Sequence, residues 1–247
     1  SIIQAHLANI RYIIKQGDAE KVIFHSSNDM LIMDGLSEYL KDKKNIFHLR
    51  KCTSDSLWWV SKRAVKDFSV SIFFNHKLYA SQIEGSMYDI SLLKNLANDL
   101  DKQDLILDSE LFYPREEIIF SSFAYKEDIK PDGLPYIYSE IHNFDRCFFR
   151  YIELFKFIAK RNCFFGKLFR RLLSDTLTVL NKDHINIPLI KSILDRKYPS
   201  EKEIMLNDSL SLKWIVYDNH SLFGVKRVKR DLSDPVRKFI SSRYIKI

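Results

Sequence analysis

The chain has 247 residues, of which 46% are apolar and 29% charged, enough for one large domain with a substantial core. It contains only six glycines and six prolines, so the composition excludes a long disordered protein and argues against a sandwich of many tight turns. Lysine and arginine outnumber aspartate and glutamate by 39 to 32, and the formal net charge of +7 indicates an anionic partner: nucleic acid, a phospholipid surface or a phosphorylated substrate.

Localisation signals point to the cytoplasm. Charged residues interrupt every apolar stretch before the ~20 residues that a transmembrane helix requires. Residues 1–9 lack the basic start and the apolar centre of a secretory signal. Cys52, Cys147 and Cys163 cannot all pair with one another and show no CxxC spacing, which fits a reduced compartment. We therefore expect a cytoplasmic protein, with peripheral association at the inner face of a membrane as the alternative.

The first half of the chain alternates between helical and strand-like patterns. Apolar residues recur at helical spacing over residues 2–14, and Gly17 ends this predicted helix. The apolar run 21–25 predicts a buried strand, and a polar turn over 26–29 follows it. The other elements predicted before residue 101 are a strand over 57–60 and helices over 33–41, 61–68 and 92–100.

Predicted helices dominate the second half. Pro114, followed by acidic residues, is typical of a helix start. Residues 143–180 predict a long helical region that breaks near Gly166. A strand-like run over 212–217 precedes a basic tail.

This order of elements predicts an α/β fold with a mostly parallel sheet flanked by helices and a helical C-terminal half. We expect one domain over 1–247, made of an α/β part (1–140), a helical insertion (141–205) and a closing strand with a basic tail (206–247). Ligands of such sheets bind at the carboxyl ends of strands, so the turn that ends at Asp29 is a candidate site. A lone aspartate there is commonly a turn former whose carboxylate binds a backbone amide.

Two adjacent carboxylates, Glu116 and Glu117, are the candidate catalytic residues. The dipole at a helix start favours their ionised forms, and an ionised carboxylate in a cleft can act as a general base on a hydroxyl. The alternative is that the two residues only cap the helix.

A basic segment near the C-terminus is the candidate diphosphate-binding site. Lys226, Arg227 and Arg230 can neutralise phosphate oxygens where no metal does so. The alternatives are a solvated basic face and a nucleic-acid patch. No Asp-x-Asp occurs on the turn at Asp29, the histidines show no ligand spacing, and no glycine-rich phosphate loop occurs anywhere in the chain. We therefore expect neither a metal nor a cofactor, and the sequence argues against a kinase and a Rossmann dehydrogenase.

Residues 144–173 combine many basic and aromatic side chains with only two acids, Asp145 and Glu153. A basic, aromatic, amphipathic helix is typical of a membrane interface. The alternative is a pair of core-packing helices with basic solvent faces.

Four segments, in the same order, resemble the core-2/I-branching glycosyltransferase family. They are FHSSNDMLI (24–32), SLWWVSKRAV (56–65), PREEIIFSSF (114–123) and SLKWIVYDNHSLFGVK (211–226). The first is similar to a strand and turn ending in Ser-Gly-x-Asp-Phe-Pro-Leu, and the second to an aromatic pair followed by Ser-Arg. The third is similar to Pro-Asp-Glu-x-x-x-x-Thr-Leu, and the fourth to Leu-x-Trp-Ile…Leu-Phe-Ala-x-Lys-Phe.

The resemblance implies a GT-A-type fold, inversion at the sugar carbon and no required metal. It places the catalytic base at Glu117 and a contact with the donor diphosphate at Lys226. The family's first motif contains a glycine and a proline that are absent around Asp29, and further strands that hold the nucleotide base would precede Ser1. The expected sugar-binding residues are Asp29, Trp58, Trp59 and Trp214.

We therefore expect an inverting, metal-independent glycosyltransferase of surface polysaccharide synthesis. Its donor would be a nucleotide-sugar, UDP-linked, and its acceptor a glycan or a lipid-linked molecule, with membrane-surface contact through 144–173. A basic nucleic-acid-binding protein without catalytic activity is the second hypothesis. No nucleic-acid motif supports it, so we expect no nucleic-acid partner. A peripheral membrane scaffold that uses the same segment is the third.

Overall fold

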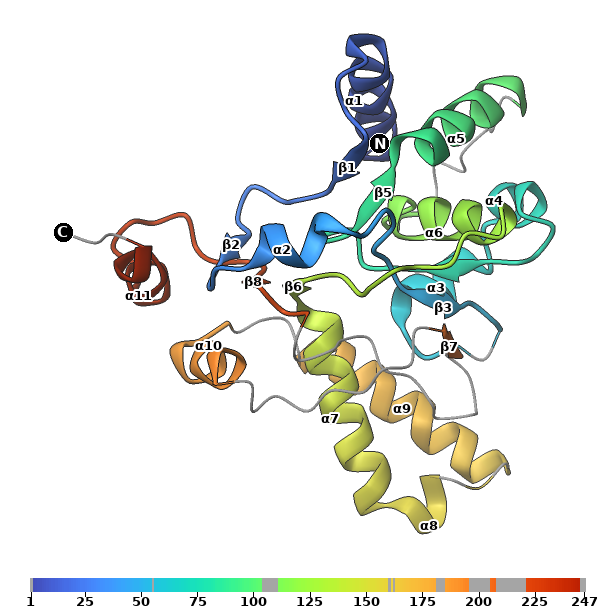
Figure 1. Cartoon of the computed structure of the whole chain (residues 1–247). Helices are drawn as coiled ribbons and strands as arrows, with labels where there is room; N and C mark the ends of the chain where they lie inside the picture. Colours follow the sequence, from blue (N-terminus) through green and yellow to red (C-terminus); the bar gives the residue numbers. More distant parts are fainter. Residues whose placement is uncertain are drawn as a thin grey trace.

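The computed structural model describes residues 2–54, 56–103, 111–159, 161, 163–180, 185–195, 205–207 and 221–244. They form a mixed α/β structure in which helices predominate and the strands are short (Figure 1). The helices are α1 (Ile2–Gln16), α2 (Leu36–Lys41), α3 (Trp59–Ala64), α4 (Phe68–Phe73), α5 (Ile90–Gln103), α6 (Glu116–Lys126), α7 (Glu140–Leu154), α8 (Lys156–Ala159), α9 (Phe164–Leu180), α10 (Ile187–Leu194) and α11 (Pro235–Tyr244). The strands are β1 (Lys21–Ile23), β2 (Met30–Leu31), β3 (Leu49–Lys51), β4 (Tyr79–Ala80), β5 (Met87–Asp89), β6 (Ile137–Tyr138), β7 (Met205–Asn207) and β8 (Gly224–Val225).

The described strands form three small sheets. Strand β8 lies between β2 and β6, antiparallel to the first and parallel to the second. Strand β3 lies between β4, which is antiparallel to it, and β7, which is parallel. Strands β1 and β5 form an antiparallel pair. The middle strand of the first sheet therefore comes from the last part of the chain.

The predicted mostly parallel sheet is wrong for these strands, because three of the five pairings are antiparallel. The alternation of helices and strands indicates which elements form, but it does not fix their direction. Strand β1 pairs with β5 rather than with the next strand in the chain, and each strand is only two or three residues long. Pairings this short depend on tertiary packing more than on local pattern.

Helix α6 lies at the centre of the α/β part, with residues 116–124 all buried. It packs against β4, and its two small serines let that strand approach closely. Ser121 Oγ and Ser122 Oγ donate to the carbonyl oxygen of Tyr79 at 2.7 and 3.1 Å, and Tyr79 N donates to Ser122 Oγ at 2.9 Å. These bonds satisfy backbone groups that burial would otherwise leave unpaired.

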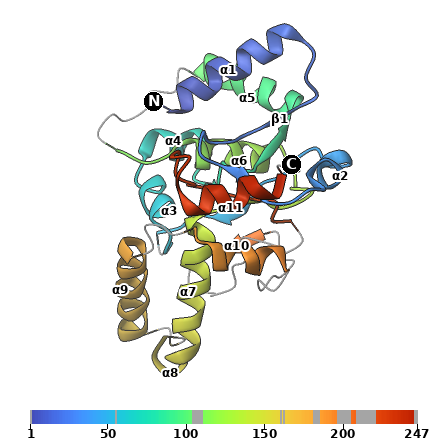
Figure 2. The same ribbon diagram turned by 90° about the vertical axis from the view of Figure 1, so that its left-hand side faces the viewer.

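Helices α1 and α5 pack side by side over one end of this core (Figure 2). They confirm the predicted helices over 2–14 and 92–100, and Gly17 ends α1 with a φ of 80°. The predicted strand over 57–60 is wrong, since α3 begins at Trp59. The buried residues of α3 follow helical spacing, which a four-residue window did not reveal.

Helices α7 and α9 pack against each other, with α8 at their far end, and project from the α/β part (Figures 1 and 2). The predicted helical region is therefore present, but its break lies between Leu154 and Phe164 rather than at Gly166. Gly166 lies inside α9, where a side chain has no room, because a Cβ there would come within 2.1 Å of the Arg161 carbonyl oxygen. Within the described part of the chain, no helix is both long and apolar enough to cross a membrane.

Candidate functional site

Five titratable side chains from four separate segments form what we call the acid–base cluster: His25, Asp29, Glu84, Glu116 and Lys226. Lys226 Nζ lies 2.6 Å from Glu84 Oε1, and His25 Nδ1 lies 3.7 Å from Asp29 Oδ2. The charge of Glu84 acts on His25, Asp29 and Glu116, and the charge of Lys226 acts on Glu116. Three carboxylates, one ammonium and one imidazole thus share one partly buried region.

Backbone geometry brings Lys226 and Glu84 to this region. Lys226 directly follows β8, and its N–H donates to the Tyr138 carbonyl oxygen at 2.8 Å. Glu84 lies on a turn whose next residue, Gly85, has a φ of 75°. A Cβ at Gly85 would lie 2.6 Å from the backbone nitrogen of Ile137, so only glycine lets the turn approach β6 this closely.

A buried glutamine fixes the same turn. Gln82 Nε2 donates to the carbonyl oxygens of Glu84 (2.6 Å) and Ile137 (2.7 Å), and its Oε1 accepts from Ser139 Oγ at 2.5 Å. Glu84 Oε2 is buried and accepts no hydrogen bond from the described residues. Burying a carboxylate oxygen without a hydrogen bond costs stability, so the ion pair with Lys226 is the contact that offsets this cost.

Asp29 organises the loop between β1 and β2. Its carboxylate accepts from Ser26 N and Ser26 Oγ, both at 2.7 Å, and its side chain is 1% exposed. Burial raises the pKa of Asp29, against these two hydrogen bonds. The interpretation of Asp29 as a turn former is therefore confirmed, and its contact with His25 adds an electrostatic role.

His25 stands at the more exposed side of the cluster. Its Nε2 is hydrogen-bonded to the hydroxyl of Tyr136. Burial lowers the pKa of His25, although the charges of Asp29 and Glu84 oppose the shift. The imidazole is therefore neutral at pH 7, and it can accept or pass a proton.

The start of α6 holds both predicted carboxylates, and both are buried. Burial raises the pKa of Glu116, and the charge of Glu84 adds to this, while Lys226 and Arg115 oppose it. The expectation that the helix start favours the ionised form is wrong for the net shift at Glu116, because desolvation outweighs the backbone contribution. Glu117 is tied to β4, since Ser81 N donates to its carbonyl oxygen at 2.7 Å.

A buried ion pair positions this helix start. Arg115 Nε and Tyr113 Oη each donate to Asp67 Oδ2 at 2.9 Å, and Asp67 is fully buried. Asp67 also caps α4 by accepting from Val70 N. The backbone just before Glu116 is therefore anchored to the start of α4.

The predicted basic residues lie along the loop after β8. Arg230 donates to Ser27 Oγ, and Val228 N donates to the Asn28 carbonyl oxygen at 3.0 Å, so this loop lies against the loop that carries Asp29. Arg227 adopts a φ of 65°, which is uncommon for an arginine. Lys226 and Arg230 therefore both reach the acid–base cluster or its loop.

The predicted tryptophans make other contacts. Trp58 is buried with its ring 5.1 Å from the guanidinium of Arg50, and Trp59 lies 5.5 Å from that of Arg63. These cations occupy one face of each indole. Trp214 lies outside the described residues.

Sequence reasoning did not assign Glu84 to a site, although it pairs with Lys226. The available signal is that Glu84 is the one charged residue between Lys77 and Asp89. An isolated charge in such a stretch is either exposed or paired after folding.

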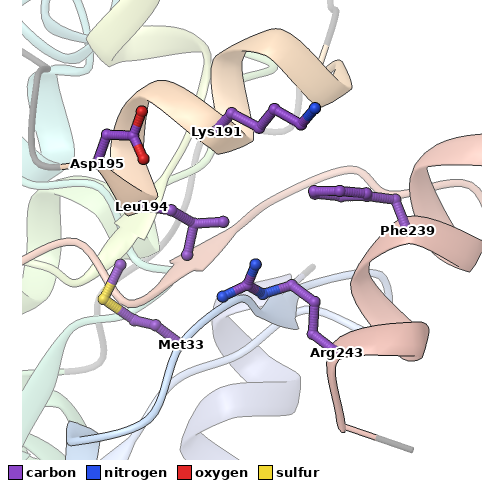
Figure 3. Close-up of a pocket in the computed structure, with 6 residues that line it drawn as sticks. All are labelled: Met33, Lys191, Leu194, Asp195, Phe239 and Arg243. Carbon is purple, nitrogen blue, oxygen red and sulfur yellow. The ribbon is translucent and has the colours of Figure 1, made fainter.

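A separate pocket of about 600 Å³ opens between α10, α11 and the residues after β2 (Figure 3). Its lining residues are Met33, Lys191, Leu194, Asp195, Phe239 and Arg243. The guanidinium of Arg243 points into the space between the helices, and Lys191 Nζ lies 5.8 Å from the centre of the Phe239 ring. The pocket suits a small anion with an apolar part, but it contains no member of the acid–base cluster, so we do not place catalysis there.

Within the described ranges, no three His, Cys, Asp or Glu side chains are grouped so that they could hold a metal ion. No family model, no curated protein and no solved structure matches the chain.

Proposed function

We propose that the chain is an inverting glycosyltransferase that needs no metal ion and uses a nucleotide-diphosphate sugar, UDP-linked, as its donor. The observation that carries this proposal is that the charge of Lys226, which is paired with Glu84, counteracts the burial that raises the pKa of Glu116. Glu116 and Lys226 come from segments far apart in the sequence, the two that resemble the catalytic-base and donor-diphosphate motifs of core-2/I-branching glycosyltransferases. The charge of Lys226 acts directly on Glu116.

The chemistry requires one base and one site of positive charge. The oxygen of an acceptor hydroxyl forms a bond to the anomeric carbon while the bond from that carbon to the diphosphate oxygen breaks. The hydroxyl proton moves to a carboxylate, and the leaving electron pair stays on the diphosphate. A base whose pKa is raised towards neutrality removes that proton more effectively than an ordinary carboxylate does.

We assign the base to Glu116 and the stabilisation of the leaving group to Lys226 and Arg230. Glu84 holds Lys226 in place through the 2.6 Å ion pair. The family resemblance alone favours Glu117 as the base. The charges that act on Glu116 favour Glu116 instead. The acceptor in this proposal is a glycan or a lipid-linked molecule, with the protein at the inner face of a membrane.

Calorimetric titration with UDP and UDP-sugars, with and without EDTA, tests the donor site. We expect binding that survives EDTA and weakens about tenfold or more in Arg230→Ala, since a charge-assisted hydrogen bond is lost. Lys226→Ala is expected to weaken it further, and circular dichroism checks that this buried substitution still folds. Lys94→Ala, an exposed lysine of α5, removes the same charge elsewhere and is expected to leave binding unchanged.

Two outcomes would contradict the proposal. The first is the absence of binding by any nucleotide. The second is binding of RNA or DNA, stronger than that of UDP, that collapses with salt, which would favour the nucleic-acid-binding alternative.

A further inference from the structure

The far end of the helical hairpin exposes an unusual amount of apolar surface. We call residues 154–159, 161 and 163–172 the hairpin tip; they include α8 and the first half of α9. Phe164 and Phe165 are each 73% exposed, and Phe157 is 62% exposed. The exposed large apolar side chains of the tip include Leu154, Phe157, Phe164, Phe165, Leu168 and Leu172.

The two faces of α9 explain why this surface is not part of the core. Gly166 and Arg170, four residues apart, are buried towards α7 and α8. Phe164, Leu168 and Leu172, also spaced by four, are exposed. Positions two residues apart on a helix differ by about 200°, so the exposed apolar stripe lies opposite the buried face. A helix that only packed on the core would have polar residues there.

The charged residues of the tip are all basic. Residues 154–174 contain six Lys or Arg and no Asp or Glu, so their net charge is 6 − 0 = +6, against +7 for the whole chain. Lys156, Arg161, Lys167 and Arg171 are all exposed beside the aromatic rings. A protein surface that docked here would have to be acidic and apolar at once, and a second copy of the tip would be repelled.

The tip is rigidly built. Arg170 Nη1 donates to the carbonyl oxygens of Ala159 and of Arg161 (3.2 Å to the second), at the end of α8. The Phe155 and Phe169 rings contact each other edge to face at 5.7 Å. The tip lies at the end of a helical hairpin that projects from the α/β part (Figures 1 and 2).

We propose that the hairpin tip binds the surface of an anionic lipid bilayer. Its phenyl rings enter the boundary between headgroups and acyl chains, and its lysines and arginines contact lipid phosphates. The inference stands on the tip alone and does not depend on the chain being a glycosyltransferase. It commits to a peripheral contact, not to a membrane-spanning segment.

Vesicle flotation of the full chain tests the proposal. We expect binding to vesicles with about one third anionic phosphatidylglycerol, little binding to pure phosphatidylcholine, and a decline as salt is raised. The double variant Phe164→Ser, Phe165→Ser is expected to reduce partitioning about tenfold or more, because two buried rings are lost from the interface. Lys167→Gln with Arg171→Gln is expected to reduce binding to anionic vesicles only.

The matched control is Phe68→Ser with Phe112→Ser, because these rings are 73% and 84% exposed but lie outside the tip. If this control reduces flotation as much as the tip variant does, exposure in general, and not the tip, is responsible. If the tip variant floats like the unchanged chain, or if it converts a dimer to a monomer in light scattering without changing flotation, the membrane assignment is wrong.

Discussion

Helices α6 and α9 differ in the kind of residue that they bury and expose against the usual preference. Helix α6 buries the carboxylates of Glu116 and Glu117, whereas α9 exposes the phenyl rings of Phe164 and Phe165. Burying a carboxylate lowers the free energy of unfolding, and an exposed phenyl ring contributes almost nothing to it. Neither arrangement is needed to make the fold stable, and each agrees with the role proposed above for its region: acid–base chemistry for the start of α6 and membrane-surface attachment for the rings of α9.

The largest effect is expected at Glu116. If this residue is the general base, Glu116→Gln should lower the transfer rate by about 10²–10⁴-fold while keeping its shape and burial. Glu117→Gln, the matched variant of the next residue, should lower it by less than about tenfold. Initial rates with UDP-sugar and acceptor measure both. The reverse order would move the base to Glu117.

The pH profile of the same reaction sharpens this assignment. Burial raises the pKa of Glu116, so the unchanged enzyme should lose activity as pH falls through that raised value, where the base becomes protonated. In Glu116→Gln the residual rate should no longer follow this limb. A limb that persists unchanged in the variant belongs to another group of the cluster, such as Asp29.

The support of α6 is expected to be the next most sensitive point. Asp67→Ala leaves the buried Arg115 guanidinium without its carboxylate, which should lower the free energy of unfolding by about 3–5 kcal/mol. Asp101→Ala removes a partner of Arg11 at the surface and should cost less than about 1 kcal/mol. Urea unfolding compares the two. Equal losses would show that Asp67 is not a special anchor of the helix start.

An effect of intermediate size is expected at His142, in the first turn of α7, where the hairpin joins the α/β part. Burial lowers the pKa of His142 well below 6.5, and the nearby charges of His48 and Arg50 add to this. The folded state therefore binds fewer protons than the unfolded state. This contribution to stability is complete above pH 6.5 and is lost as pH falls towards the folded pKa, by about 1.4 kcal/mol per pH unit.

Urea unfolding across this pH range checks the sign. In His142→Gln the acid-side decline should be shallower than in the unchanged chain. His76→Asn, at an exposed histidine with a φ of 59°, should leave the decline as it is. The raised pKa of Asp29 works in the opposite direction, since it favours the folded state as pH falls. A slope that does not change in His142→Gln would contradict the prediction.

The smallest effect is expected at the hairpin tip. Because Phe165 is exposed, Phe165→Ala should change the free energy of unfolding by less than about 0.5 kcal/mol, as should Phe112→Ala. Thermal unfolding in the absence of lipid measures both. A much larger loss at Phe165 would mean that its ring packs in solution, and the contrast between α6 and α9 would then disappear.

Local patterns predicted the elements whose residues carry their own signal. The helices at residues 2–16, 90–103 and 116–126 follow periodic apolar residues and, for the last, a proline with two acids. The strand at 21–23 follows a short apolar run. Strand direction was not predictable in the same way, because β8 finds its partners β2 and β6 only in the folded chain.

The residues of the candidate site also differ in whether a local sequence pattern predicts them. Glu116, Asp29 and Lys226 each stand at a recognisable place, a helix start, a turn and a basic run, and were predicted as candidates. Their partner Glu84 was not, because its role depends on Gly85 approaching β6 and on a hydrogen bond from Gln82. The exposure of Phe164 was equally hidden, since a sequence shows that a helix has two faces but not which of them packs inward.

The place of β8 in the first sheet also has a consequence for biosynthesis. The segment that carries β8 and Lys226 leaves the ribosome after residues 1–223, yet it forms the middle strand between β2 and β6. Until then β2 and β6 lack the strand that joins them, and Glu84 lacks its ion pair with Lys226. Because domains are completed by their latest non-local contacts, a nascent chain that stalls before residue 226 holds an unfinished sheet without this ion pair.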